Sequence, residues 1–258
     1  MTTFEMKEAR PLSRPIDIGE RGKDEAGNPI SLDRRLFMQF LAFGDCHDVA
    51  GVAAALEQTG VSAVLYEDAA DPYGIGLLFF NEDPNYFLDE ARAMLNAAPF
   101  TGLTPKPEYT MFGRTYSIGY EQDLERVLIN RPIERVCDPA YRWAVWYPLR
   151  RAGSFEQLTP DEQNEILREH GGIGRAYGSS DLAHDIRLAC HGLDKNDNDF
   201  IAGLVGKDLL PLSHLVQRMR KTKQTSQHLA SLGPFFIGRV AWQPKLNLNQ
   251  THGTEVPS

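Results

Sequence analysis

The sequence has few cysteines, no long apolar run and no excess of basic residues among its 258 residues. Its three cysteines, Cys46, Cys137 and Cys190, are too far apart for a zinc knuckle or a redox dithiol, so we expect reduced thiols in a cytoplasmic protein. No apolar run approaches the roughly 18 residues that span a bilayer, so we expect no membrane span. The segment Met1 to Arg10 has no apolar core of the kind that a signal peptide needs, which also favours the cytoplasm.

Basic residues are outnumbered, because 27 Lys and Arg stand against 35 Asp and Glu and give a formal net charge of -8. A protein that grips the nucleic-acid backbone needs a basic surface, so nucleic acid is not an expected partner. The seven histidines include no pair with the i, i+4 spacing of a helical zinc site. With 42% hydrophobic and 24% charged residues, the composition is otherwise that of a globular protein.

One acidic segment, Asp194 to Asp199, has oxygen ligands at alternate positions, as a calcium-binding loop does. The sixth position of such a loop needs glycine for its sharp bend, and here it is Asp199. The twelfth position needs a bidentate glutamate, and here it is Val205. We therefore expect a polar turn between two strands rather than a calcium site.

Hydrophobic periodicity predicts the same order of elements twice, strand-helix-strand-strand-helix-strand. In the first half the expected elements are a strand 36–43, a helix 47–58, strands 61–66 and 75–80, a helix 84–95 and a strand 109–120. In the second half they are a strand 142–149, a helix 160–170, strands 185–192 and 200–205, a long helix 210–229 and a strand 235–242.

Each half has the βαββαβ order of a ferredoxin-like domain, so the expected fold is α+β, with two such domains joined as in a dimeric α+β barrel. The predicted divisions are an extended N-terminal arm 1–33, an N-terminal domain 34–140, a C-terminal domain 141–242 and a flexible tail 243–258. Two such sheets packed face to face are expected to enclose a pocket.

His170 stands out by its position at the end of a predicted helix that Thr159 caps and Pro160 begins. The sequence Gly171-Gly172-Ile173-Gly174 follows, and we expect the chain to leave the helix there and to let a bulky group approach the backbone. A lone histidine at a helix C-terminus is more often a partner of the helix dipole than a ligand, so position alone leaves both interpretations open.

The second half contains an ordered set of motifs: Trp146 to Arg151, Leu158 to Glu162, Glu169 to Gly171, Gly174 to Tyr177, Gly192 to Asp194 and Asp199-Phe200. This set resembles the chlorite dismutase family of haem proteins, which also contains the coprohaem decarboxylases of bacterial haem synthesis. The resemblance covers residues 141–242, while the first half agrees only in element order. It implies two ferredoxin-like halves with haem in the C-terminal one.

On this resemblance His170 is the proximal axial ligand of the haem iron. The iron requires a neutral imidazole whose other ring nitrogen donates to a fixed acceptor. In the family that acceptor is usually a glutamate on the last helix, and the matching residue here is Gln224. Because an amide brings no negative charge, we expect a higher reduction potential than a glutamate would give.

Tyr147 matches the radical tyrosine of the coprohaem decarboxylases, where a phenol oxidised by the haem removes hydrogen from a propionate. A strand aromatic is also common as a purely structural residue, so that interpretation stays open. Arg150 and Arg151 match basic residues near the propionates, and strand alternation gives only Arg151 the same side as Tyr147. Arg175 is a further candidate for a propionate contact, and each arginine has a solvated surface role as its alternative.

The distal side departs from the family pattern. Chlorite dismutases carry an arginine thirteen residues after the proximal histidine, and the residue here is Ala183. Arg187 on the following strand is our candidate for that role, with His184 or Asp185 as alternatives. Phe155-Glu156 also replaces a pair of tryptophans on the proximal side.

The resemblance implies a haem-dependent oxidoreductase whose cofactor is haem b or iron-coproporphyrin III. The expected reaction is peroxide-dependent oxidative decarboxylation of iron-coproporphyrin III in haem biosynthesis. Splitting of chlorite into chloride and dioxygen is the first alternative, and a haem carrier or sensor without turnover is the second. The expected partners are a porphyrin, hydrogen peroxide or chlorite, and further copies of the chain, because family members commonly form pentamers.

Overall fold

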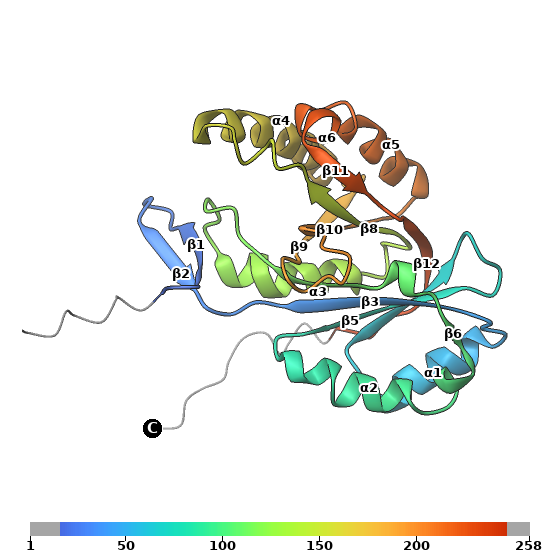
Figure 1. Cartoon of the computed structure of the whole chain (residues 1–258). Coiled ribbons are helices and arrows are strands. Elements are labelled where there is room, and N and C mark those ends of the chain that lie inside the picture. The colour runs from blue at the N-terminus through green and yellow to red at the C-terminus, as the bar shows by residue number, and fades with distance from the viewer. Residues whose placement is uncertain (1–15, 247–258) are drawn as a thin grey trace, which may run out of the picture.

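The computed structural model describes residues 16–246, and its central feature is a closed antiparallel β-barrel. Around the barrel the strands follow the order β8-β10-β9-β7-β3-β5-β4-β12, and β12 pairs with β8 to close the ring. Helices α1 and α2 lie outside one side of the barrel, and α4, α5 and α6 lie outside the opposite side (Figure 1). The predicted α+β fold of the barrel type is confirmed.

The twelve strands of the described residues include the eight of the barrel, the two of an N-terminal hairpin, and the short strands β6 and β11 at the barrel's margins. Their bounds are β1 Glu20–Lys23, β2 Pro29–Leu32, β3 Phe37–Gly44, β4 Ala63–Asp68, β5 Ile75–Asn81, β6 Thr104–Pro105, β7 Met111–Thr115, β8 Trp143–Arg151, β9 His184–Ala189, β10 Phe200–Gly206, β11 Leu229–Leu232 and β12 Phe236–Trp242.

The helices alternate with these strands so that each half repeats the predicted βαββαβ order. The α-helices are α1 Val49–Thr59, α2 Glu90–Leu95, α3 Arg131–Val136, α4 Pro160–Ser179, α5 Leu209–Met219 and α6 Lys223–Gln227. One π-helical turn, Arg126–Asn130, precedes α3, and 3-10 turns cover Pro84–Phe87, Phe100–Gly102 and Pro107–Tyr109.

The two halves share the barrel, because β9 of the second half pairs with β7 of the first and β12 pairs with β4. The predicted domain boundary near residue 140 falls in the loop between α3 and β8. A division into separate domains stays a prediction, since the strand pairing is continuous across both halves.

Aromatic side chains fill the barrel interior. The Phe40 ring lies 4.7 Å from that of Phe236 and 6.0 Å from that of Trp146, measured between centroids, and all three are almost completely buried. The interior of an eight-stranded barrel is just wide enough for packed side chains. Within residues 16–246, the pocket that we expected between the two sheets is therefore absent, and the space is a hydrophobic core.

Helix α4 differs from the prediction in length. It does not end at His170 but continues through the glycines to Ser179. Its start is as predicted, because Thr159 and Glu162 form a reciprocal capping box, with the Thr159 amide 2.8 Å from the Glu162 carboxylate. The prediction failed because glycine weakens a helix without forbidding it.

The predicted helix 210–229 is divided into α5 and α6, and its last residue begins β11. Thr222 causes the second start, because its hydroxyl accepts a hydrogen bond from the Thr225 amide and caps α6. The predicted helix 84–95 is likewise divided, into the 3-10 turn Pro84–Phe87 and α2.

Within the described part of the expected N-terminal arm, β1 and β2 pair as a hairpin. The hairpin packs on the loop after β7, where the Lys23 amide donates to the Glu121 carbonyl at 3.0 Å and Arg114 pairs with Glu20 at 2.7 Å. Residues 1–15 of the arm and residues 247–258 of the predicted tail lie outside the described residues.

The segment before β8, which includes α3, was not predicted as helical. Strand β7 pairs with β9 only at Arg114–Ala189 and Thr115–Leu188, which leaves the first half of β9 without this partner. The Arg135 guanidinium donates to the Asp185 carbonyl there at 2.6 Å. The segment α3 thus covers an edge that β7 is too short to reach.

Within residues 16–246, no helix is both long and apolar enough to cross a membrane.

Candidate functional site

The candidate site lies on the outer face of the second half's sheet, beneath α4, α5 and α6 (Figure 1). Residues directly opposite each other on paired strands point to the same face of a sheet. The strand register pairs Tyr147 with Ala202 and Ala202 with Arg187, so these residues form one row on β8, β10 and β9. Asp185 lies two residues from Arg187 on β9, in the next row on the same face of the sheet. Two residues predicted for catalysis, Tyr147 and Arg187, are therefore brought to one face.

His170 projects from α4 and is partly buried. Burial lowers the pKa of its imidazole, and the positive charge of Arg151 acts in the same direction, while Asp185 opposes them. The imidazole is therefore neutral at pH 7, which is the form that binds a metal. These charges on β8 and β9 act on His170 because α4 lies over the same sheet face.

Thr222 is the hydrogen-bond partner of His170. The imidazole Nδ1 lies 3.4 Å from the Thr222 hydroxyl, and Thr222 is almost completely buried. That hydroxyl donates its single proton to the Met219 carbonyl at 2.8 Å, so it accepts from Nδ1–H. Nε2 is then left with its lone pair, the arrangement that an axial iron ligand needs.

Gln224, which we expected as this partner, lies two residues further along, on α6. Its side chain is buried, and among residues 16–246 its Oε1 has no hydrogen-bond partner. The structure therefore differs from the prediction, because a threonine hydroxyl takes the place expected for the glutamine carbonyl. The division of the predicted long helix brings Thr222 to His170.

The glycines after His170 fit the close approach of a large flat group. A Cβ at Gly172 would meet no atom within 4 Å, and one at Gly171 would meet only the end of the Arg175 side chain, at 3.5 Å. Each glycine weakens a helix interior by about 1 kcal/mol relative to alanine. Since the protein's own packing does not require glycine there, the open space and the Gln224 orphan oxygen are consistent with a bound porphyrin.

Tyr147 is buried, and its ring stacks on that of Phe235 with centroids 4.5 Å apart. Burial raises the pKa of its phenol to about 12, and nearby Asp185 adds to the effect. No hydrogen bond of its hydroxyl is found within the described residues. The phenol is thus protonated and free to reach a ligand.

Arg151 points to the same face as Tyr147, and Arg150 points away from it, as strand alternation predicts. The Arg151 guanidinium lies 4.2 Å from the ring centroid of Phe155 and 4.9 Å from that of Phe200, and its Nε is buried without a partner among residues 16–246. Arg150 is exposed and pairs with Asp197 at 2.7 Å. Of the two, Arg151 is the one placed to hold a carboxylate at the site.

The remaining predicted residues lie at the margins. Arg175 is exposed on α4 and folds back toward Gly171. Phe155 is buried under Arg151, whereas Glu156 is exposed, with 3.9 Å between its carboxylate and the Arg151 guanidinium. Among the alternatives for the distal residue, His184 bonds Tyr141 and Asp181, each at 2.8 Å, and so is engaged elsewhere.

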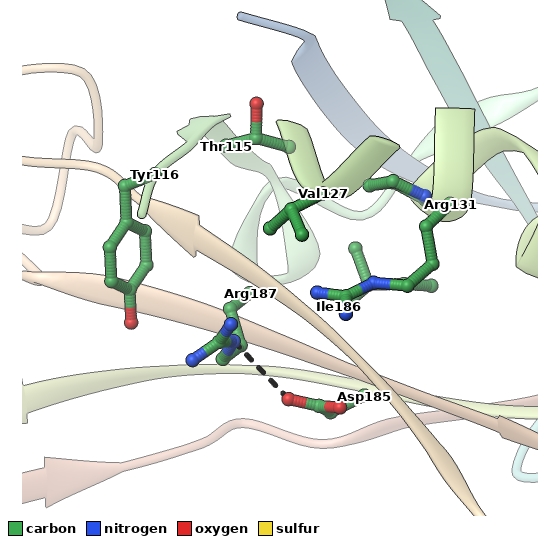
Figure 2. A pocket seen from close by; sticks show the side chains of 8 residues that line it. Thr115, Tyr116, Val127, Arg131, Asp185, Ile186 and Arg187 are labelled. Atoms are coloured by element: carbon green, nitrogen blue, oxygen red, sulfur yellow. Dashed lines mark ion pairs between the residues drawn. The ribbon is translucent and has the colours of Figure 1, made fainter. Parts of the chain in front are cut away.

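Arg187 lines a small pocket, where it forms an ion pair with Asp185 (Figure 2). Its guanidinium lies 3.3 Å from Asp185 and 3.7 Å from Glu121, and 5.8 Å from the ring centroid of Tyr116. Arg131 extends into the same pocket from α3, and within residues 16–246 it has no ion pair.

The charges of this pocket affect one another. Burial opposes ionisation of Asp185, but Arg187, Arg135 and Arg131 outweigh it, so the pKa of Asp185 is lowered. Burial also lowers the pKa of Arg131, and its arginine neighbours add to this. Sequence reasoning missed Tyr116 and Arg131, because one lies past the end of β7 and the other in an unpredicted helix.

A separate cleft of about 250 Å³ lies beside β4 and contains none of the predicted site residues. Its acids are paired within the protein, since Lys106 lies 3.0 Å from Asp68 and 2.6 Å from Asp71, and Arg239 lies 2.6 Å from Glu67. This cleft is not part of the candidate site.

Comparison with known proteins shows which protein family the sequence matches. The sequence profile of a family described as "Chlorite dismutase" matches residues 77–241, and so reaches into the first half. A haem-binding protein from Thermus thermophilus is similar in structure, with a TM-score of 0.61 and 17% identity, covering 81% of this chain and 92% of that one. Chlorite dismutase from Candidatus Nitrospira defluvii, in complex with imidazole, has a TM-score of 0.63 and 16% identity, with coverage of 81% and 92%.

Proposed function

Because the chain belongs to the chlorite dismutase family, we propose that it is a haem-dependent oxidoreductase that binds an iron porphyrin between α4 and the second half's sheet. His170 would hold the iron through Nε2, with Nδ1–H donated to Thr222. The open space beside Gly172 and the unpartnered Oε1 of Gln224, judged within residues 16–246, support this position.

Within this class, we favour peroxide-dependent oxidative decarboxylation of iron-coproporphyrin III to haem b, a step of haem synthesis. Tyr147 and Arg151 share one sheet face beneath α4, and this observation carries the proposal. When bound, the iron porphyrin supplies the reaction with peroxide and a one-electron oxidant. Tyr147 would remove hydrogen from a propionate side chain, while Arg151 would hold the propionate carboxylate through charge-assisted hydrogen bonds.

The substrate test uses the chain loaded with iron-coproporphyrin III and treated with hydrogen peroxide. Mass spectrometry of the extracted porphyrin is expected to show loss of two carboxyl groups. Tyr147→Phe is expected to retain the Soret band but to abolish the mass change. Tyr86→Phe, which removes a buried tyrosine of the first half, is the matched control. An unchanged porphyrin mass in the wild-type protein would falsify the reaction.

Chlorite splitting is the second candidate, because Arg187 lies in the same row as Tyr147 and a guanidinium suits an oxyanion. Its acidic partners Asp185 and Glu121 already engage this arginine, which makes it a poorer anion site. Dioxygen evolution from chlorite that is lost in Arg187→Ala would establish this candidate. A haem carrier without turnover would show a Soret band and neither activity.

The cellular setting follows from the same proposal. Haem synthesis in bacteria and the reduced, buried cysteines suit a cytoplasmic protein. We also propose a homo-oligomer, with light scattering of the purified protein as the test.

A further inference from the structure

Tyr177 lies on α4 seven residues after His170, so both side chains project from the same face of the helix. Seven residues correspond to about 10 Å along a helix axis. The Tyr177 ring is buried in the same hydrophobic cluster as Tyr147. Tyr177 is therefore a second buried phenol close to the proposed iron ligand.

The Tyr177 hydroxyl makes a short hydrogen bond to an imidazole. Its oxygen lies 2.7 Å from Nδ1 of His214 on α5, and His214 is exposed. The phenol is thus buried while its proton acceptor reaches solvent. Tyr147 has no such acceptor within the described residues, so the two tyrosines differ in where a proton can go.

We propose that Tyr177 is a redox-active tyrosine that gives one electron to a bound haem oxidised by peroxide, while its proton passes to His214. The inference rests on the haem binding proposed above. A phenol that loses an electron becomes a strong acid, so oxidation is easy only where a base takes the proton at the same time. Nδ1 of His214 is such a base, already in hydrogen-bond contact.

The step balances in atoms and charge. The O–H bond of Tyr177 breaks, an N–H bond forms at Nδ1 of His214, and one electron reduces the oxidised haem by one equivalent. The product is a neutral tyrosyl radical beside an imidazolium ion, which releases a proton to solvent because His214 is exposed. The oxidising equivalent then lies under the α5 surface, where a small soluble one-electron donor, such as a phenol, can reduce it.

The first test is freeze-quench electron paramagnetic resonance of the haem-loaded chain after addition of peroxide. It is run in a Tyr147→Phe background, so that Tyr147 contributes no radical. We expect a tyrosyl signal that falls several-fold in Tyr177→Phe and forms more slowly in His214→Gln, because an amide cannot take up the proton. Tyr86→Phe is the matched control and should leave the signal unchanged.

The second test needs no haem. Since Cys46, Cys137 and Cys190 are buried, a ruthenium photosensitiser can be attached to Gln217→Cys, an exposed α5 position one turn from His214. After a flash with an external electron acceptor, we expect tyrosyl absorption that Tyr177→Phe abolishes. Its rate should be slower in D₂O, and this isotope effect should be lost in His214→Gln.

The outcomes separate the two proposals. A Soret band that does not form on porphyrin addition overturns haem binding, and the photosensitised experiment still tests Tyr177. A haem-loaded protein whose radical signal is the same in Tyr177→Phe as in its parent overturns the relay. So does a photosensitised radical that Tyr177→Phe leaves unchanged.

Discussion

At the scale of single residues, Thr222 connects His170, the proposed iron ligand, to the backbone of α5. Its hydroxyl receives Nδ1–H of His170 and donates to the Met219 carbonyl, so it selects the tautomer that leaves Nε2 available. Removing such a hydrogen-bond partner of a metal ligand typically reduces metal affinity about ten- to hundred-fold. Thr222→Val is expected to weaken haem binding by that factor, measured by Soret titration.

Thr222→Ser is the control for that substitution, because it retains the hydroxyl. It should restore both the affinity and the iron–histidine stretching frequency in the resonance Raman spectrum. If Thr222→Val and the wild type share one frequency and one affinity, Thr222 does not orient His170.

Substitution of Gln224 can test how a negative charge near His170 changes the reduction potential of the proposed haem. The substitution Gln224→Glu would put an anion into a buried position near Thr222, and a negative charge near the iron ligand favours ferric haem. We expect a lower reduction potential than in the wild type, measured by spectroelectrochemistry. Gln227→Glu adds the same charge at an exposed position of α6 and should have a smaller effect. A potential in Gln224→Glu that is equal to or above the wild-type value would contradict this expectation.

The raised pKa of Tyr147 predicts that this residue lowers the stability of the folded protein at alkaline pH. Its pKa is about 12 in the folded protein, whereas an unfolded tyrosine ionises near pH 10. Its contribution is fully present below about pH 10 and is lost as pH rises towards about 12, because only the unfolded state releases the proton in this range. Between neutral pH and about pH 12, the free energy of unfolding should therefore fall less in Tyr147→Phe than in the wild type. The expected difference is on the order of 2 kcal/mol.

Urea unfolding at neutral and alkaline pH measures this difference. Tyr73→Phe, at a half-exposed position, is the control and should follow the wild-type curve. Parallel loss of stability in Tyr147→Phe and in the wild type would show that Tyr147 ionises normally in the folded protein.

The sequence predicted some of these residues better than others. Strand periodicity alone separates Arg151 from Arg150, because alternate residues of a strand face opposite sides. Thr222 was missed because the pattern from 210 to 229 reads as one helix. A threonine that caps a second helix differs from a mid-helix threonine only in tertiary context.

At the scale of elements, the glycines of α4 combine low helix propensity with unused space. Gly172→Ala should stabilise the haem-free protein by about 0.5–1 kcal/mol, since a Cβ there meets no atom within 4 Å. If a porphyrin occupies that space, the same methyl group should weaken its binding. Thermal unfolding of the haem-free chain and Soret titration measure the two opposite effects.

Gly178→Ala is the matched control in the same helix, because its Cβ would make only an ordinary contact at 3.9 Å. It should stabilise the protein without a change in haem affinity. Unaltered haem binding in Gly172→Ala would place the porphyrin away from this turn of α4.

Element order was predictable and element ends were not. The apolar runs of the barrel strands are dense enough to be recognised, as for Phe37–Gly44. The sequence predicts that α4 ends at His170, because consecutive glycines usually follow a helix, whereas the helix continues to Ser179. Helix α3 was missed because its role, covering the edge of β9, depends on how far β7 extends.

At the scale of the whole molecule, the barrel core couples the two halves. Phe40 of the first half packs on Trp146 and Phe236 of the second. Phe40→Ala should cost about 3–5 kcal/mol. Since Trp143, Trp146 and Trp242 all belong to the second half, tryptophan fluorescence should report the same loss as far-ultraviolet circular dichroism.

Leu88→Ala, at an exposed apolar position of the first half, is expected to change stability by less than about 0.5 kcal/mol. A fluorescence transition that stays in place while the circular dichroism transition shifts would mean that the halves unfold separately.

The architecture of the whole was predictable from the repeated βαββαβ order, but the place of the site was not. Packing of the two sheets was expected to leave a pocket between them. Closure of eight strands instead leaves room for side chains only, and the proposed porphyrin position lies outside the barrel, under α4. The width of a barrel depends on how its strands pair, which one-dimensional periodicity does not encode.

The strand pairs β7–β9 and β12–β4, which join the two halves, determine what happens when the halves are expressed separately. Either half expressed by itself would present two unsatisfied strand edges, and such edges recruit neighbouring polypeptides into aggregates. Co-expressed fragments cut in the loop before β8 would find their complementary edges in each other, so the protein is suited to split-reporter complementation.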